Sequence, residues 1–99
     1  MTDTKAIAVA AVATPHAKKY LVQLCKHFEH KRPASWGDDK GRIEFTTGDC
    51  DLSADETILH ITASATSAEN LPQLEDVIAR HLVRFAFREE LAIDWRPGA

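Results

Sequence analysis

The sequence predicts an α+β domain in which two helices pack on one face of an antiparallel sheet. Two segments carry apolar residues at the three- and four-residue spacing of an amphipathic helix. The remaining segments alternate apolar and polar residues, which is typical of strands with one buried face. The resulting order, β-α-β-β-β-β-α, favours a curved sheet that grips a long C-terminal helix, as in TATA-binding-protein-like and helix-grip arrangements.

The first helix is expected over residues 15–30. Thr14 is suited to cap it, and Pro15 is suited to its first turn. Pro33 ends it, because the residue before a proline is pushed out of the helical region. The apolar stripe of this helix is Ala17, Tyr20, Leu21, Leu24 and Phe28.

The second helix is expected over residues 70–87. Asn70 is suited to the N-cap, Gln73 to the position that reaches back to the cap, and Pro72 to the first turn. The apolar stripe of this helix is Leu71, Leu74, Ile78, Leu82 and Phe85.

Extended segments make up the predicted sheet. Ala6–Ala13 is the first strand, because Ile7, Val9 and Ala11 share one face. Polar turns separate four further strands, at residues 34–37, 41–46, 49–53 and 57–63. A last alternating stretch at residues 91–95 is expected to close the sheet.

Length and composition indicate one globular domain. Ninety-nine residues can bury a single core, and 44% hydrophobic with 27% charged residues are ordinary values. We expect one domain over residues 1–99, with an ordered core at about 6–95 and a frayed tail at 96–99. Trp36 and Trp95 are interpreted as anchors at the edge of the core.

The charge and the N-terminus bear on partners and compartment. The net charge of −3 argues against nucleic-acid binding, and no apolar run is long enough to span a membrane. The run Ala6–Ala13 ends like a signal-peptidase site, but it lacks Leu and Phe and follows Asp3. We therefore expect a cytoplasmic protein with reduced cysteines.

The peptide LCKHFEHK places Cys25, His27 and His30 within six residues, which resembles the start of a metal site. On a helix, however, Cys25 and His27 lie on opposite flanks of the apolar stripe, about 160° apart, and cannot share one ion. A structural zinc site also needs four ligands, and no second pair follows close in sequence. We expect no metal and no cofactor; the remaining candidates for iron, zinc or thiol redox chemistry are Cys25, Cys50 and His81.

The peptide HLVRFAFREE places His81, Arg84 and Arg88 in a row along one edge of the second helix. Guanidinium groups in such a row can hold a carboxylate or phosphate. The alternative is that Arg84 or Arg88 joins helix to sheet by pairing with an acid of this chain. The candidate acids are Glu44, Asp51, Glu89 and Asp94.

Three motifs, TPHAKKYLVQLCKHFEHK, GRIEFTTGDCDL and LEDVIARHLVRFAFREELAIDW, resemble the domain-of-unknown-function 2218 family of small bacterial proteins. The resemblance covers residues 6–95. It maps the family pattern onto Cys25, His27, His30, Lys31, Gly48, Cys50, His81, Arg84, Phe85, Arg88, Glu89 and Trp95. Members have no established activity, and their resemblance to appendages of siderophore-interacting flavoproteins implies a context of iron acquisition.

The sequence favours a binding module for a small anionic molecule, such as a siderophore-related ligand. His81, Arg84 and Arg88 would supply the positive donors, with His27 and His30 on the facing edge. Catalysis is not expected, because the chain shows no nucleophile, base and orienting group in recognisable order and no glycine-rich phosphate loop.

Two alternatives remain open at this stage. One is an interaction module that docks onto a partner flavoprotein or forms a homodimer, through the basic residues Lys18, Lys19 and Lys26 or through an exposed tryptophan. The other is a transition-metal or thiol redox site that uses Cys25 and Cys50 with a histidine of the second helix.

Overall fold

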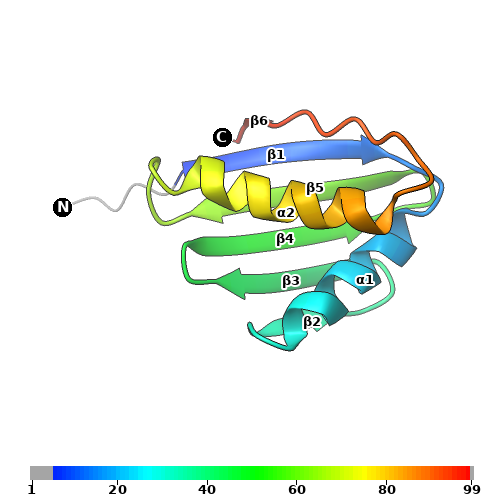
Figure 1. Cartoon of the computed structure of the whole chain (residues 1–99), viewed down its shortest axis with the longest axis horizontal. Helices are drawn as coiled ribbons and strands as arrows, with labels where there is room; N and C mark the ends of the chain where they lie inside the picture. Colours follow the sequence, from blue (N-terminus) through cyan, green and yellow to red (C-terminus); the bar gives the residue numbers. More distant parts are fainter. Residues whose placement is uncertain (1–5, 99) are drawn as a thin grey trace.

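The computed structural model describes residues 6–98, which form one six-stranded antiparallel sheet with two helices on one face (Figure 1). The elements in chain order are β1 (Ala6–Ala13), α1 (Ala17–Glu29), β2 (Ala34–Trp36), β3 (Lys40–Phe45), β4 (Gly48–Ala54), β5 (Ile58–Ala65), α2 (Leu71–Phe85) and β6 (Arg96–Pro97). The predicted fold class is confirmed, and the first five predicted strands lie within two residues of their observed bounds.

The sheet order is β2-β3-β4-β5-β1-β6. The strands β2 to β5 form a meander of neighbours, and β1 pairs with β5 along its whole length, with Ala10 opposite Ile61. The first strand of the chain is therefore held inside the sheet by strands that follow it in sequence.

Alternation along each strand separates the two faces of the sheet. Val12, Ile43, Cys50 and Ile61 point toward the helices and are almost fully buried. Their neighbours along the chain, such as Arg42, point to the opposite face, which no helix covers. The core is therefore a single layer between the sheet and the two helices.

The helix α1 begins later than expected, with His16 rather than Thr14 at its N-cap. Thr14 is still part of the sheet network, since its backbone N–H donates to the carbonyl of Thr57. Its hydroxyl accepts from the N–H of His16 and donates to Glu89, so it stabilises the turn into the helix and not the helix end. The predicted capping role of Thr14 is wrong for this reason.

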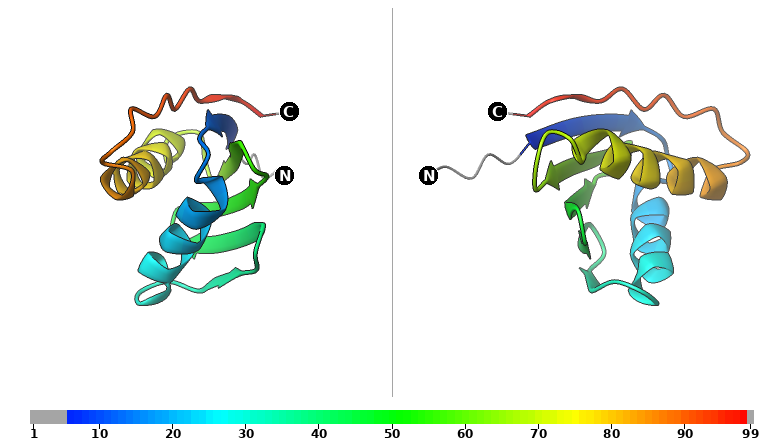
Figure 2. Two further views of the ribbon diagram at one scale, coloured as in Figure 1. Left: turned by 90° about the vertical axis from the view of Figure 1, so that its right-hand side faces the viewer. Right: turned by 60° about the vertical axis from the view of Figure 1, so that its left-hand side comes forward.

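The helix α2 crosses α1 at a steep angle (Figure 2) and covers β5 and β1, whereas α1 covers β2 to β5. Asn70 occupies the N-cap as expected, but its side chain donates to Thr66 and does not cap the helix. The buried stripe is Leu74, Ile78 and Leu82. Neither helix among residues 6–98 is long and apolar enough to cross a bilayer.

The C-terminal segment differs from the prediction. Residues 91–95 form no strand, although their alternation is real, because Leu91, Ile93 and Trp95 pack against the core. The closing strand is β6, whose residues were expected in a frayed tail; it pairs with Ala8 and Val9 of β1. Alternation reports which side chains are buried, and it does not report which backbone groups find a partner. The last residue lies outside the described part.

Candidate functional site

His27 and His81 lie side by side at the junction of the two helices, with ring centroids 4.9 Å apart. The ring of Phe28 contacts that of His81, with centroids at 4.8 Å, and the ring of Phe85 lies 5.6 Å from that of His27. The steep crossing of α1 and α2 produces this meeting, because it brings the last turn of α1 against the C-terminal part of α2. His27 and His81, two predicted site residues that are distant in sequence, therefore lie in one site.

The ring of His81 is held in one orientation. Its Nδ1 atom lies 2.7 Å from the carbonyl oxygen of Val77, one turn earlier in α2. A carbonyl only accepts, so Nδ1 carries the proton of this hydrogen bond. The other ring nitrogen, Nε2, remains the atom that His81 can offer to a ligand.

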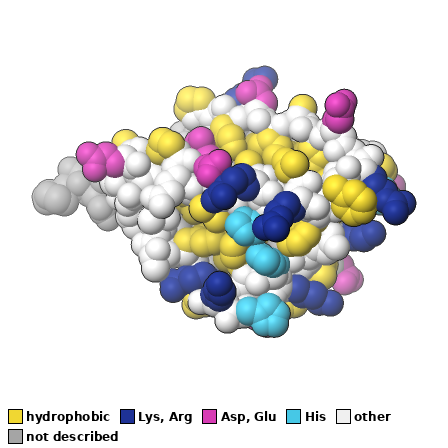
Figure 3. All heavy atoms as spheres, in the orientation of Figure 1, with side chains coloured by type: hydrophobic (Ala, Val, Ile, Leu, Met, Phe, Trp, Pro, Cys, Tyr) yellow, Lys and Arg dark blue, Asp and Glu magenta, His cyan; other side chains and the backbone are white. Residues whose placement is uncertain are grey.

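A cavity of about 390 Å³ opens at this junction. Its lining residues are His27, Phe28, His30, Lys31 and His81. The lining contains no carboxylate, and Figure 3 shows two histidine side chains in contact on this face, with Lys and Arg side chains above and below them. The site is thus basic, with one aromatic wall.

Electrostatic repulsion acts on His27 within this cluster. Burial lowers the pKa of His27, and the positive charge of His81, Arg84, His30 and Lys31 lowers it further. Two imidazolium charges about 5 Å apart repel by about 1 kcal/mol in water and by about 3 kcal/mol at an effective dielectric constant of about 20. The free protein therefore favours neutral His27 at neutral pH.

The helix ends partly explain why cations gather here. His27 lies in the last turn of α1, and Arg84 lies in the last turn of α2. The C-terminus of a helix carries partial negative charge, which stabilises nearby cations by about 0.3–1 kcal/mol each. This stabilisation is small compared with a direct carboxylate partner, so the cluster keeps its capacity to bind an anion.

The predicted row of His81, Arg84 and Arg88 is divided in the structure. Arg84 lies near His27 and belongs to the basic cluster. Arg88 follows the end of α2, and its guanidinium group lies 5.3 Å from the ring centre of Phe87. It lines a separate cavity together with Tyr20. The prediction that Arg88 joins His81 is wrong, because the helical spacing on which it depended stops at Phe85.

The proposed internal pairing of these arginines is also wrong. Among residues 6–98, neither Arg84 nor Arg88 forms an ion pair. Three of the four candidate acids have other partners: Asp51 pairs with Arg42, Asp94 pairs with Arg96, and Glu89 accepts from Thr14 and Tyr20. The positive charge of Arg84 therefore remains available to a ligand.

The two cysteines are fully buried free thiols that face the sheet–helix core. Burial raises the pKa of Cys25 to about 11, and it raises the pKa of Cys50 as well. Thiols in this setting are poor nucleophiles and poor metal ligands. In the described part of the chain, no three His, Cys, Asp or Glu side chains come together as a metal-binding group.

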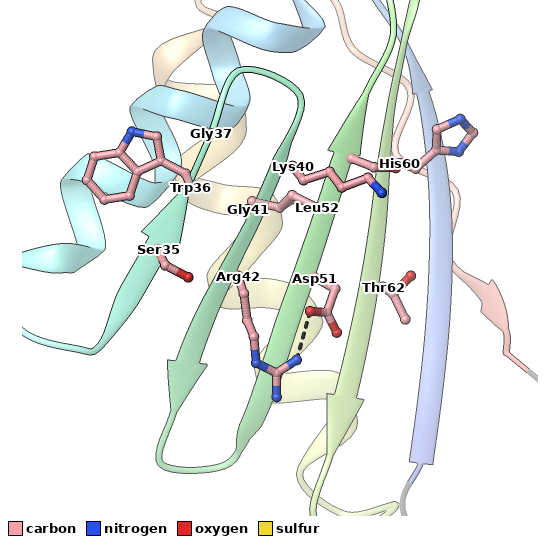
Figure 4. A pocket seen from close by; sticks show the side chains of 11 residues that line it. Ser35, Trp36, Gly37, Lys40, Gly41, Arg42, Asp51, Leu52, His60 and Thr62 are labelled. Carbon is pink, nitrogen blue, oxygen red and sulfur yellow. Dashed lines mark hydrogen bonds and ion pairs between the residues drawn. The ribbon is translucent and has the colours of Figure 1, made fainter.

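A second hollow, which the sequence reasoning missed, lies on the helix-free face of the sheet (Figure 4). It has a volume of about 540 Å³ and is lined by Ser35, Arg42, Asp51, His60 and Thr62, among others. Of its two cations, Lys40 and Arg42, the second is already paired, because Arg42 contacts Asp49 at 2.8 Å and Asp51 at 2.7 Å. Alternation in residues 41–46 did signal that Arg42 points to this face, but not that the face is hollow.

The fold and the basic cavity define a small two-layer α+β domain with a cationic site between its helices. The family "Uncharacterized protein conserved in bacteria (DUF2218)" matches residues 9–96, and the chain belongs to this family. The resemblance inferred from the three motifs is thus confirmed.

A solved structure supports the fold. The NMR structure of PA4090 from Pseudomonas aeruginosa has a TM-score of 0.78 and 30% sequence identity, and the match covers 93% of this chain and 96% of that one. No curated protein matches the chain.

Proposed function

We propose that the protein is a binding module for a small organic anion, held in the cavity at the junction of α1 and α2. The observation that carries the proposal is the convergence of His27, His81 and Lys31 around a cavity without a carboxylate, with the positive charge of Arg84 acting on His27 from outside the lining. A ligand that brings negative charge would relieve the repulsion among these groups. The wall formed by Phe28 favours a ligand with an apolar body beside its anionic group.

A siderophore-related carboxylate is one ligand of this chemical class, and the iron-acquisition context implied by the family resemblance is the reason to include it. The proposal itself depends only on charge and shape. His30 would contribute at the rim of the cavity, and Arg88 would not take part, since it lies in another cavity.

The experiment is a titration of ¹⁵N-labelled protein with benzoate, followed by amide and side-chain chemical shifts. We expect shifts at residues 27–31 and 77–84 with a Kd of about 1–10 mM. Arg84→Gln should weaken binding by about 3- to 10-fold. The matched control is Arg80→Gln, since Arg80 lies one turn earlier on α2 but pairs with Asp76, and it should bind like wild type.

A second candidate function is docking to another protein, either a second copy of this chain or a partner flavoprotein. Among residues 6–98, Val83 and Phe87 are the exposed large hydrophobic side chains, at 50% and 76% exposure. In the sequence they flank Arg84 of α2, and aromatic residues with arginine are common in interface hot spots. The expected basic edge also exists, as Lys18, Lys19 and Lys26 line one hollow.

Sedimentation velocity over a range of concentrations tests the homodimer form of this function. Association that Phe87→Ser abolishes would support it. A monomer at all concentrations would leave only a different protein as the partner.

A further inference from the structure

We infer that the cavity between α1 and α2 selects a phosphate monoester group, a tetrahedral dianion, over groups of the same shape that carry a single charge. The inference rests on the proposed function, because it concerns the same site. It adds the chemical class of the ligand and the role of a proton in its binding.

The number and origin of the donors favour a tetrahedral group. His81 can offer only Nε2, since its Nδ1 is bonded to Val77, and His27 offers a ring nitrogen from the other helix. Lys31 lines the same cavity, and Arg84 lies close to His27. The three donors that line the cavity, His27, Lys31 and His81, can each face one of the three terminal oxygens of a phosphate monoester. A planar carboxylate offers only two oxygens.

Charge, and not shape alone, decides the preference. In the free protein the charge of His81 opposes protonation of His27, at a centroid separation of 4.9 Å. A monoanion can offset one added positive charge. A dianion can offset two, so that both imidazoles carry a proton while the ligand is bound.

Binding therefore includes the uptake of a proton from solvent onto a ring nitrogen of His27. The charged and titratable groups that face this ring are His30 and Lys31, just past the end of α1, and His81 and Arg84 on α2. No carboxylate stands among them, and on its other sides the ring contacts Phe85 and Phe28. The ligand is the group that would supply the missing negative charge.

The test compares phenyl phosphate with phenyl sulfate, since both are tetrahedral and carry the same aromatic body. At pH 7 the phosphate ester is mainly a dianion, with a second pKa of about 6, and the sulfate ester is a monoanion. Binding is measured by ¹⁵N and imidazole chemical shifts, and the titration of His27 is measured in the free protein and with each ligand.

We expect phenyl phosphate to bind at least about 5-fold more tightly than phenyl sulfate at pH 7 and to raise the pKa of His27 by about one unit or more. The affinity for phenyl phosphate should fall between pH 7 and pH 8.5, as the proton becomes harder to take up. His27→Gln should bring the two ligands within about 2-fold of each other, and its unchanged amide spectrum away from the cavity would show that it folds.

Equal binding of the two esters at this cavity, with no change in the pKa of His27, would overturn the inference and leave the proposed function intact. Absence of binding by phenyl phosphate, phenyl sulfate and benzoate at residues 27–31 and 77–84 would overturn both.

Discussion

The hydroxyl of Tyr20 donates a hydrogen bond to the carboxylate of Glu89, 69 residues further along the chain. The hydroxyl of Thr14 donates to the other oxygen of the same carboxylate at 2.9 Å. These two bonds attach the segment after α2 to the beginning of α1. If α2 continued, its spacing would place Glu89 near the apolar stripe. The helix instead ends at Phe85, and the Glu89 carboxylate accepts hydrogen bonds from two hydroxyls.

Removal of the Tyr20 hydroxyl should destabilise the fold. Tyr20→Phe keeps the ring in the core but removes one of the two hydrogen bonds to Glu89, and bonds to charged groups are stronger than neutral ones. We expect Tm to fall by a few degrees, measured by circular dichroism. Glu89→Gln should have a similar effect, and the double variant should be little worse than either single one. Additive losses would show that the two residues act separately.

The same contact predicts a dependence of stability on pH. The hydrogen bond from Tyr20 lowers the pKa of Glu89. The stability that ionised Glu89 contributes is therefore present above pH 5 and is lost as the pH falls through the lowered pKa of Glu89. Burial and Glu89 raise the pKa of Tyr20 to about 12. The stability that the protonated Tyr20 hydroxyl contributes is therefore complete below about pH 10 and is lost as the pH rises through about 12. The difference in Tm between wild type and Tyr20→Phe should be constant from pH 6 to pH 9 and should shrink outside it. A difference that grows in acid would contradict the assignment.

Gly48 should be intolerant of any side chain. Its φ of 152° is one that other residues rarely adopt, and an added Cβ would lie 2.1 Å from the backbone oxygen of Ser64. Gly48→Ala should cost about 3 kcal/mol or more in urea unfolding. The control is Gly37→Ala, where a Cβ meets nothing within 4 Å and the change should stay within about 0.5 kcal/mol. Similar effects at both positions would contradict this account.

The two thiols should be unreactive in the folded protein. Because burial raises the pKa of both Cys25 and Cys50, little thiolate is present at pH 8. Labelling with a disulfide reagent should be slow in buffer. In denaturant it should be fast, and both cysteines should react. Rapid native labelling of either cysteine would revive the redox interpretation.

Much of the fold was predictable because alternation and helical spacing both report burial. Leu21 and Leu24 were expected on the apolar stripe of α1, and Leu74 and Leu82 on that of α2, and the structure buries all four. The errors occur where local geometry depends on distant partners. Thr14 is an example, since its hydroxyl bonds to Glu89 at the other end of the chain.

The candidate site was only partly predictable. Spacing along α1 separated Cys25 from His27, and the structure places Cys25 in the core and His27 beside His81. The meeting of His27 with His81 depends on the angle at which two helices cross, which neither helix sequence encodes alone. Arg88 was misplaced because nothing in FAFREE indicated that the helix would stop at Phe85.

The site should also respond to a change in His81 that keeps its size. His81→Gln retains a polar side chain but removes the group that can become an imidazolium facing the cavity. We expect benzoate affinity to fall by about 3- to 10-fold, measured by the same shift titration, with Tm nearly unchanged. The control is His60→Gln on the helix-free face, which should bind benzoate like wild type. An equal loss in both variants would indicate that overall charge, and not this cavity, governs binding.

The most direct measurement of the central claim is a set of intermolecular nuclear Overhauser effects between benzoate and ¹³C-labelled protein. Binding at the helix junction predicts contacts from the benzoate ring protons to the rings of Phe28 and His81, which line the cavity. Contacts to Trp36 and Thr62, which line the hollow on the helix-free face, would contradict the claim. So would the absence of any contact at a benzoate concentration that saturates the shift changes.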